Sequence, residues 1–231
     1  MDHIGYAFTE FPALYALEMH HWEDAAALQP PADAKPLDQL TTYWARAIGA
    51  GQLHDADGAR KDLEQYDSLL ESVRKSKQAY LAELLAAVPR DEISAWVAFA
   101  ENKNDEAVRL MRRAADRQDA QGKDETEIPA REMLANMLLE LQRSQEALAE
   151  YEQSMKVDPN RFNGLYGAAR AAELAGQPAK SNSYYATLLK NCVNAHSDRP
   201  ELARARTVLA GNSEKATAAG SDQKGIGRSH Q

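Results

Sequence analysis

The sequence has few of the residues on which several fold classes depend. It contains a single cysteine, Cys192, among 231 residues, so the chain cannot form a disulfide within itself. Aromatic residues make up only 7% of the chain, whereas alanine is abundant, as in helices that pack closely. No apolar run approaches the roughly 18–20 residues that a membrane-spanning helix needs. No stretch alternates apolar and polar residues for long, so we do not expect a strand-rich fold.

Positive charge is also scarce. Lys and Arg number 27 against 35 Asp and Glu, which gives a formal net charge of −8 at pH 7. Polyanions repel such a chain, so we do not expect a nucleic-acid partner. The first residues, "MDHIGYAFTEF", lack both the basic start and the long apolar segment of a signal peptide. We therefore expect a cytoplasmic protein.

Helical periodicity, by contrast, runs through almost the whole chain. Proline and capping residues indicate where several helices start or stop. We expect Thr9 to cap the first helix with Pro12 in its first turn, Pro89 to break or kink its helix, and Asp105 to cap the next one. The predicted helices lie at about residues 9–20, 22–28, 37–50, 59–76, 77–88, 90–101, 106–118, 130–143, 144–157, 161–175, 178–193 and 199–210.

A repeat of 34 residues emerges when the chain is compared with itself. A shift of 34 places Ala135 on Ala169 and Tyr151 on Tyr185, and earlier it places Ala25 on Ala59. Between these pairs the spacing lengthens, because Ala107 lies 48 residues after Ala59 and 40 before Ala147. Two antiparallel helices approach closely only where facing side chains are small, so the recurring small residues indicate stacked helix pairs.

These residues resemble the tetratricopeptide-repeat (TPR) family. The best-matching repeat, residues 128–161, has consensus residues at Leu134, Ala135, Leu138, Ala147, Tyr151, Ser154 and Pro159. The next repeat has them at Leu165, Ala168, Ala169, Gly176, Ser181, Tyr185 and Leu188. A weaker match covers residues 87–121, and "NRFNGLYGAARAAELAG" is similar to the C-terminal part of longer bacterial TPR proteins of undefined function.

The resemblance implies an all-α fold, a right-handed α-α superhelix of four to five helix pairs with a C-terminal capping helix. Residues 211–231, with four glycines and one large apolar residue, Ile226, predict a disordered tail. The expected segments are a degenerate helix pair (1–29), a proline-rich connector (30–36), degenerate TPR-like pairs (37–127), two repeats with a capping helix (128–210) and the tail (211–231).

For function, the resemblance implies a non-catalytic scaffold or adaptor without a cofactor, whose first helices line a concave groove for a peptide of a partner protein. Glu132 stands where the family's carboxylate clamp has a lysine, so we do not expect an EEVD-like C-terminus as ligand. The predicted groove residues are Glu132, Asn136, Glu140, Asn163, Tyr166, Arg170 and Glu173.

Two constellations leave an enzymatic alternative, a metal- or Cys/His-dependent hydrolase. Metal-like clusters occur at His20-His21-Glu23-Asp24 and, more weakly, at His54-Asp55-Asp57. Adjacent histidines on a helix point about 100° apart, so we interpret these clusters as solvated helix ends rather than metal sites. Cys192 and His196 stand four residues apart, with Asp198 to orient the imidazole, but we interpret Cys192 as a packed apolar residue.

Two further alternatives stay open. Arg109, Arg113 and Arg117, with Arg112 alongside, form a basic stripe that either binds an anion or is the solvated outer face of a helix. The chain is alternatively a purely architectural segment that packs against the remainder of a longer TPR protein.

Overall fold

A computed structural model describes residues 3–122, 128–195 and 197–211. Within these ranges every regular element is a helix and no strand occurs, as the periodicity predicts. The helices are α1 (His3–Glu18), α2 (Trp22–Ala27), α3 (Pro36–Gln52), α4 (Ala56–Arg74), α5 (Ala79–Ala100), α6 (Asn104–Gln121), α7 (Ala130–Glu140), α8 (Ser144–Ser154), α9 (Phe162–Leu174) and α10 (Pro178–Asn191), followed by helical residues 200–211. No helix of the described ranges is long and apolar enough to cross a membrane. Apart from residue 211, the predicted tail lies outside the described residues.

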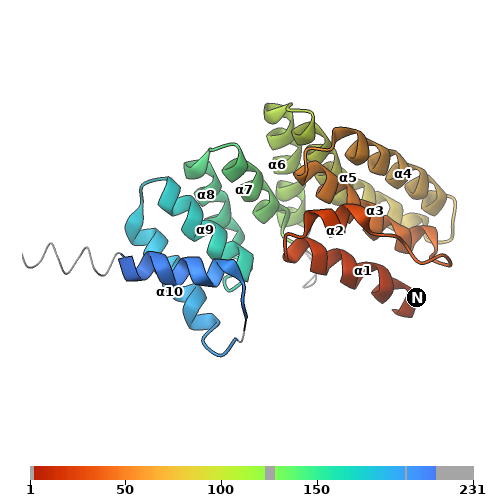
Figure 1. Cartoon of the computed structure of the whole chain (residues 1–231). Coiled ribbons are helices and arrows are strands. Elements are labelled where there is room, and N and C mark those ends of the chain that lie inside the picture. The colour runs from red at the N-terminus through yellow and green to blue at the C-terminus, as the bar shows by residue number, and fades with distance from the viewer. Residues whose placement is uncertain (1–2, 123–127, 196, 212–231) are drawn as a thin grey trace, which may run out of the picture. The chain divides into compact units, whose positions relative to one another are not determined.

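The chain forms two compact units that divide between Leu141 and Gln142. In the first unit, the consecutive helices from α3 to α7 pack on one another, and α3 also packs on α1 and α5 (Figure 1). In the second unit, α9 packs on both α8 and α10. The division falls between α7 and α8, inside the stretch that best matches the repeat.

The same tight turn joins the two helices of every predicted pair. One residue of each turn has a positive φ, between 56° and 70°: these residues are His20, His54, Asn102, Gln142 and Gly176. Their spacing of 34, 48, 40 and 34 residues equals the spacing predicted from the small residues. At the turns of His20, His54, Asn102 and Gly176, the residue after the positive-φ residue donates its N–H to a carbonyl five residues earlier, as in His21 to Ala16 (2.8 Å) and Gln177 to Ala172 (2.8 Å). This bond is the Schellman closure of a helix C-terminus.

Small side chains lie at fixed distances from these turns. Seven residues before each positive-φ residue stands an alanine with no exposed surface: Ala13, Ala47, Ala95, Ala135 and Ala169. Five residues after it stands a second small residue, at most 2% exposed: Ala25, Ala59, Ala107, Ala147 and Ser181. The described chain is therefore built from five copies of one helix–turn–helix arrangement.

Each unit has its own apolar core. In the first unit, Tyr66, Leu70 and Val73 of α4 pack among α3 and α5 residues that include Ala47 and Ile93. In the second unit, Leu165, Ala169, Tyr185 and Leu188 pack with Leu202 and Ala205 of the last helix. The last helix is therefore part of the apolar core of the second unit.

Three local expectations are wrong. Helix α1 begins at His3, so Thr9 and Pro12 lie inside it, with Pro12 exposed. Helix α5 runs through Pro89, so the expected break does not occur, whereas a kink there stays a prediction. Val88 and Asp91, on either side of the proline, are buried, and their packing outweighs the roughly 3 kcal/mol cost of the ring. Lys103 rather than Asp105 is the N-cap of α6, because the turn at Asn102 places the helix start two residues later, at Asn104.

Candidate functional site

The predicted groove residues of the second unit lie on one face of α9. Asn163, Tyr166, Arg170 and Glu173 follow one another at spacings of three and four, which places them on one side of a helix. The last helix packs against this side. Arg199 donates to the Asn163 side chain over 3.2 Å, and Arg204 donates to both Glu173 oxygens over 2.8 and 3.1 Å.

Glu173 is the centre of this face. Besides Arg204, its carboxylate accepts hydrogen bonds from Arg170 over 3.0 Å and from the Tyr185 hydroxyl over 3.2 Å. Partial burial raises the pKa of Glu173, but the hydrogen bond and charge of Arg204, together with Arg170, outweigh this and hold the pKa below its usual value. The carboxylate therefore stays ionised and binds the last helix to α9.

Arg199 makes a second anchor at the start of the last helix. Its guanidinium lies 3.8 Å from the centre of the Phe162 ring and pairs with Glu201 over 2.9 Å. A cation over an aromatic face at this distance is attracted by the ring quadrupole. The end of α9 that carries Asn163 is thus covered by residues that the sequence analysis did not single out.

The predicted groove residues on α7 differ in their exposure. Glu132 is 1% exposed, Asn136 is half-buried and Glu140 is exposed. Because Glu132 presents almost no surface, Asn136 and Glu140 are the α7 side chains that a ligand can reach. Helix α7 belongs to the first unit and α9 to the second, so the predicted arrangement of Asn136 opposite Arg170 stays a prediction.

Elsewhere in the first unit, the same face of neighbouring first helices is joined by a direct contact. Trp44 and Glu92 stand ten residues before their respective turns, as Glu132 and Tyr166 do. The Trp44 indole donates to Glu92 over 2.7 Å. Side chains at this repeat position therefore meet between α3 and α5.

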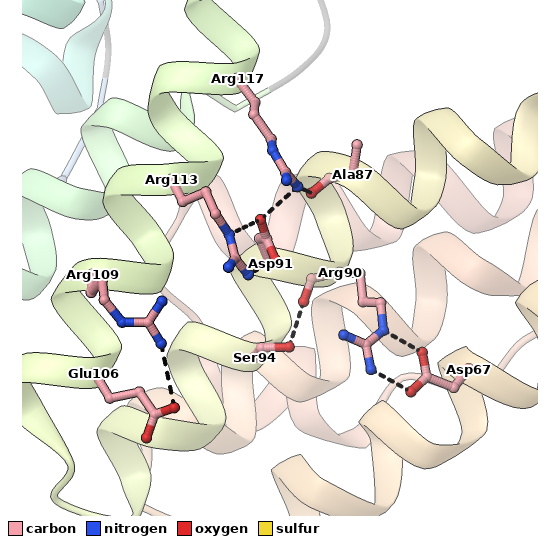
Figure 2. A network of polar contacts seen from close by, with 9 residues as sticks. All are labelled: Asp67, Ala87, Arg90, Asp91, Ser94, Glu106, Arg109, Arg113 and Arg117. Carbon is pink, nitrogen blue, oxygen red and sulfur yellow. Dashed lines mark hydrogen bonds and ion pairs between the residues drawn. The ribbon is translucent and has the colours of Figure 1, made fainter.

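Two arginines of the basic stripe on α6, Arg113 and Arg117, form ion pairs with α5. Arg113 donates from Nε to Asp91 over 2.7 Å, and Arg117 donates to the same carboxylate over 2.9 Å and to the Ala87 carbonyl over 3.2 Å (Figure 2). Arg109 pairs with Glu106 of its own helix over 3.6 Å. Asp91 is 4% exposed, so it needs these partners in order to be buried as a carboxylate.

This network changes the interpretation of the stripe. The hydrogen bonding that Arg113 donates to the Asp91 carboxylate raises the pKa of Arg113. Between α4 and α5, Arg90 of α5 donates two hydrogen bonds, of 2.7 and 2.9 Å, to the carboxylate of Asp67 of α4 (Figure 2). Arg113 and Arg117 are therefore neither an open anion site nor a purely solvated face, because they link consecutive helices.

A hollow of about 280 Å³ lies next to this network, lined by Asp67, Leu70, Glu71, Arg74 and Arg90. Its charged residues pair among themselves, since Arg90 binds Asp67 and Arg74 contacts Glu71. These pairs occupy the polar groups that a ligand would use.

The predicted metal-like clusters do not assemble. Among the described residues, no group of three or more His, Cys, Asp or Glu side chains is arranged to hold a metal ion. His20 stacks on Trp22 with ring centres 4.9 Å apart, and His21 approaches Asp24 at 3.4 Å. His20 and His54 are themselves the positive-φ residues of two turns, so each already has a structural place in the repeat.

Cys192 lies at the end of α10. It is half-buried and packs against the apolar core of the second unit, as the packed interpretation predicts. His196, the other half of the proposed pair, lies outside the described residues.

Comparison with known proteins returned no match: no family model, no curated protein and no solved structure matches the chain.

Proposed function

We propose that this chain is a non-catalytic scaffold that binds a peptide segment of a partner protein on the shared face of its first helices. The observation that carries the proposal is the Trp44–Glu92 contact, in which equivalent positions of successive first helices meet. A face that continues from repeat to repeat suits an extended peptide, because the peptide then meets the same kind of side chain at regular intervals.

The repeat geometry supports the finer part of the proposal, a right-handed TPR-type superhelix. Five turns of one kind, each with an alanine seven residues before and a small residue five residues after, match the places where TPR repeats need close helix contact. The family and the superhelical arrangement rest on this pattern and on the sequence resemblance.

Three side chains are the best candidates for gripping the ligand. Asn136 both donates and accepts, as an extended peptide backbone requires. Tyr166 is half-buried and offers an apolar ring, and Arg170 can hold a carboxylate in a two-pronged contact. Asn163 and Glu173 instead hold the last helix, so their role is to position it beside the ligand.

Arg170 favours a peptide that carries an acidic group. Arg170 pairs with Glu173 at 3.0 Å, with a quarter to a third of each side chain exposed. An ion pair that is partly exposed to solvent contributes at most about 1 kcal/mol to stability. An incoming carboxylate can therefore replace Glu173 as the partner of Arg170 with little loss of free energy. Arg204 keeps Glu173 neutralised when Arg170 turns away.

The test is the double substitution Asn136→Ala with Arg170→Ala, compared in an affinity capture from native extract followed by mass spectrometry. We expect the partner that wild-type protein captures to be lost, while the melting temperature stays within about two degrees, since both side chains reach the surface. Gln145→Ala with Arg206→Ala is the matched control, because it removes an amide and a guanidinium at exposed positions. Partner capture that survives the first double substitution contradicts the proposal.

A further inference from the structure

Three aromatic side chains stand exposed on one side of α1. Phe8 and Phe11 are each 66% exposed and Tyr15 is 62% exposed, and their spacing of three and four residues places them on one helix face. Two of the chain's four phenylalanines are in this set, which we call the α1 stripe. A contiguous patch of exposed apolar side chains marks an interaction site, whereas single exposed apolar residues do not.

The repeat shows what normally covers these positions. The stripe residues stand 12, 9 and 5 residues before the turn residue His20. In the later first helices the same positions are buried, apart from the half-buried Arg90. They are Thr42, Ala45 and Gly49 in α3, Arg90, Ile93 and Val97 in α5, Ala130, Met133 and Met137 in α7, and Gly164, Gly167 and Ala171 in α9.

In each case the covering element is the second helix of the preceding pair. A Cβ on Gly49 would lie only 2.7 Å from the Trp22 carbonyl of α2. Arg90 binds Asp67 of α4, and the Ala130 N–H donates to Gln118 of α6 over 2.8 Å.

The contact of α9 with α8 shows how such a face is matched in size. Gly167 leaves no room for a Cβ beside the buried Tyr151 ring, so a large residue on the second helix meets a residue without a side chain on the first. The α1 stripe has the reverse arrangement, with large rings on the first helix. Its complement is a helix with small residues at the contact.

We propose that the α1 stripe is a docking face for an amphipathic α-helix of a partner protein that presents small side chains, seated as a preceding second helix would be. The area argues for a single helix rather than a second copy of the chain. Phe and Tyr side chains carry about 150–250 Å² each, so the stripe leaves on the order of 300–500 Å² uncovered. A stable dimer needs about 800 Å² from each partner. The three rings stand at i, i+3 and i+7 of α1, so they line one side of the helix and can all contact a single helix laid along it.

The test uses the whole chain and a labelled peptide that copies residues 143–158 with Tyr151→Ala. A staple on the opposite face holds the peptide helical, because free helices of this length are marginal in water. Fluorescence anisotropy should show saturable binding. The chain with Phe8→Ser and Phe11→Ser should bind about tenfold or more weakly. Tyr80→Ser with Val193→Ser, which removes two other exposed apolar residues, should leave binding unchanged.

Each alternative outcome contradicts a specific step. Absence of saturable binding to the wild-type chain, or equal binding by the stripe variant, overturns the docking face. Equal affinity of the peptide that keeps Tyr151 overturns the size argument on which the choice of ligand rests. Sedimentation analysis that finds a dimer, lost with Phe8→Ser and Phe11→Ser, would assign the stripe to a second copy instead. The four substituted positions, two in the stripe and two in the control, are all exposed, so thermal melts should show that both variants are folded.

Discussion

At the scale of single residues, this chain depends on side chains that are small rather than large. The alanines before each turn and the small residues after it allow the helices to approach, and they have almost no exposed surface. A close-packed protein interior accepts a larger side chain only if the surrounding side chains or backbone shift. A larger residue at any of these positions should therefore be costly, whatever its hydrophobicity.

Ala147 offers a sharp test of this requirement. Ala147 has no exposed surface, whereas Ala149, two residues further on the same helix, is exposed. Ala147→Leu should overpack the helix contact and lower the free energy of unfolding by about 1–3 kcal/mol. Ala149→Leu should change it by less than about 0.5 kcal/mol. Urea denaturation measures both values, and similar shifts for the two variants would show that position 147 is not a close contact.

At the scale of elements, ion pairs hold consecutive helices in register around apolar contacts. Asp91 and Asp67 bind arginines of adjacent helices in the first unit, and Glu173 binds the last helix in the second. These ion pairs join residues 22 to 31 positions apart in the sequence, so they report the tertiary arrangement rather than local helix propensity.

The last helix should become less firmly bound in acid. Because the pKa of Glu173 is lowered in the folded protein, its stabilising contribution is complete above the pKa it has in the unfolded chain. The contribution is lost as the pH falls through the lowered folded pKa. Hydrogen exchange of residues 200–211, corrected for the intrinsic rate at each pH, should therefore show less protection at pH 3 than at pH 6.

Glu173→Gln separates this carboxylate from the general effects of acid. The amide keeps the shape but not the charge, so the variant should have weaker protection at pH 6 and a smaller change between pH 6 and pH 3. Glu140→Gln, at an exposed position on α7, serves as the control and should behave as wild type. The same pH dependence in Glu173→Gln and wild type would exclude Glu173 as the group that titrates.

At the scale of the whole molecule, the two units have separate cores and should respond separately to damage. Leu70 lies in the core of the first unit and Leu188 in that of the second, each at most 2% exposed. Truncation of either leucine to alanine should cost about 2–5 kcal/mol. In repeat proteins, stability is divided among neighbouring repeats, so each loss should concentrate in its own unit.

Hydrogen exchange read by mass spectrometry can locate these losses. Leu188→Ala should lower protection mainly in residues 142–211, and Leu70→Ala mainly in residues 3–141. An equal loss of protection across both ranges in either variant would mean that the chain unfolds as one cooperative body.

Much of the fold follows from the sequence because its signals are local and repeat. The small residues predicted four to five helix pairs, and their spacing, including the long intervals of 48 and 40, equals that of the five positive-φ turn residues. The sequence analysis did not single out the α1 stripe, because its significance depends on knowing that later first helices bury those positions. Local rules failed at Pro12 and Pro89, where a single lost hydrogen bond competes with the packing of a whole helix.

By itself, the sequence determined the helical class and the spacing of the turns, because side-chain volume and periodicity act over a few residues. Only the tertiary structure decided which charges pair. Asp91 lies 22 and 26 residues from Arg113 and Arg117, and Glu173 lies 31 residues from Arg204. The ion pairs turned a predicted basic stripe into a link between helices, and joined Asn163 and Glu173 to the last helix. Charge interactions act through space, so spacing along a chain cannot reveal them until the helices are packed.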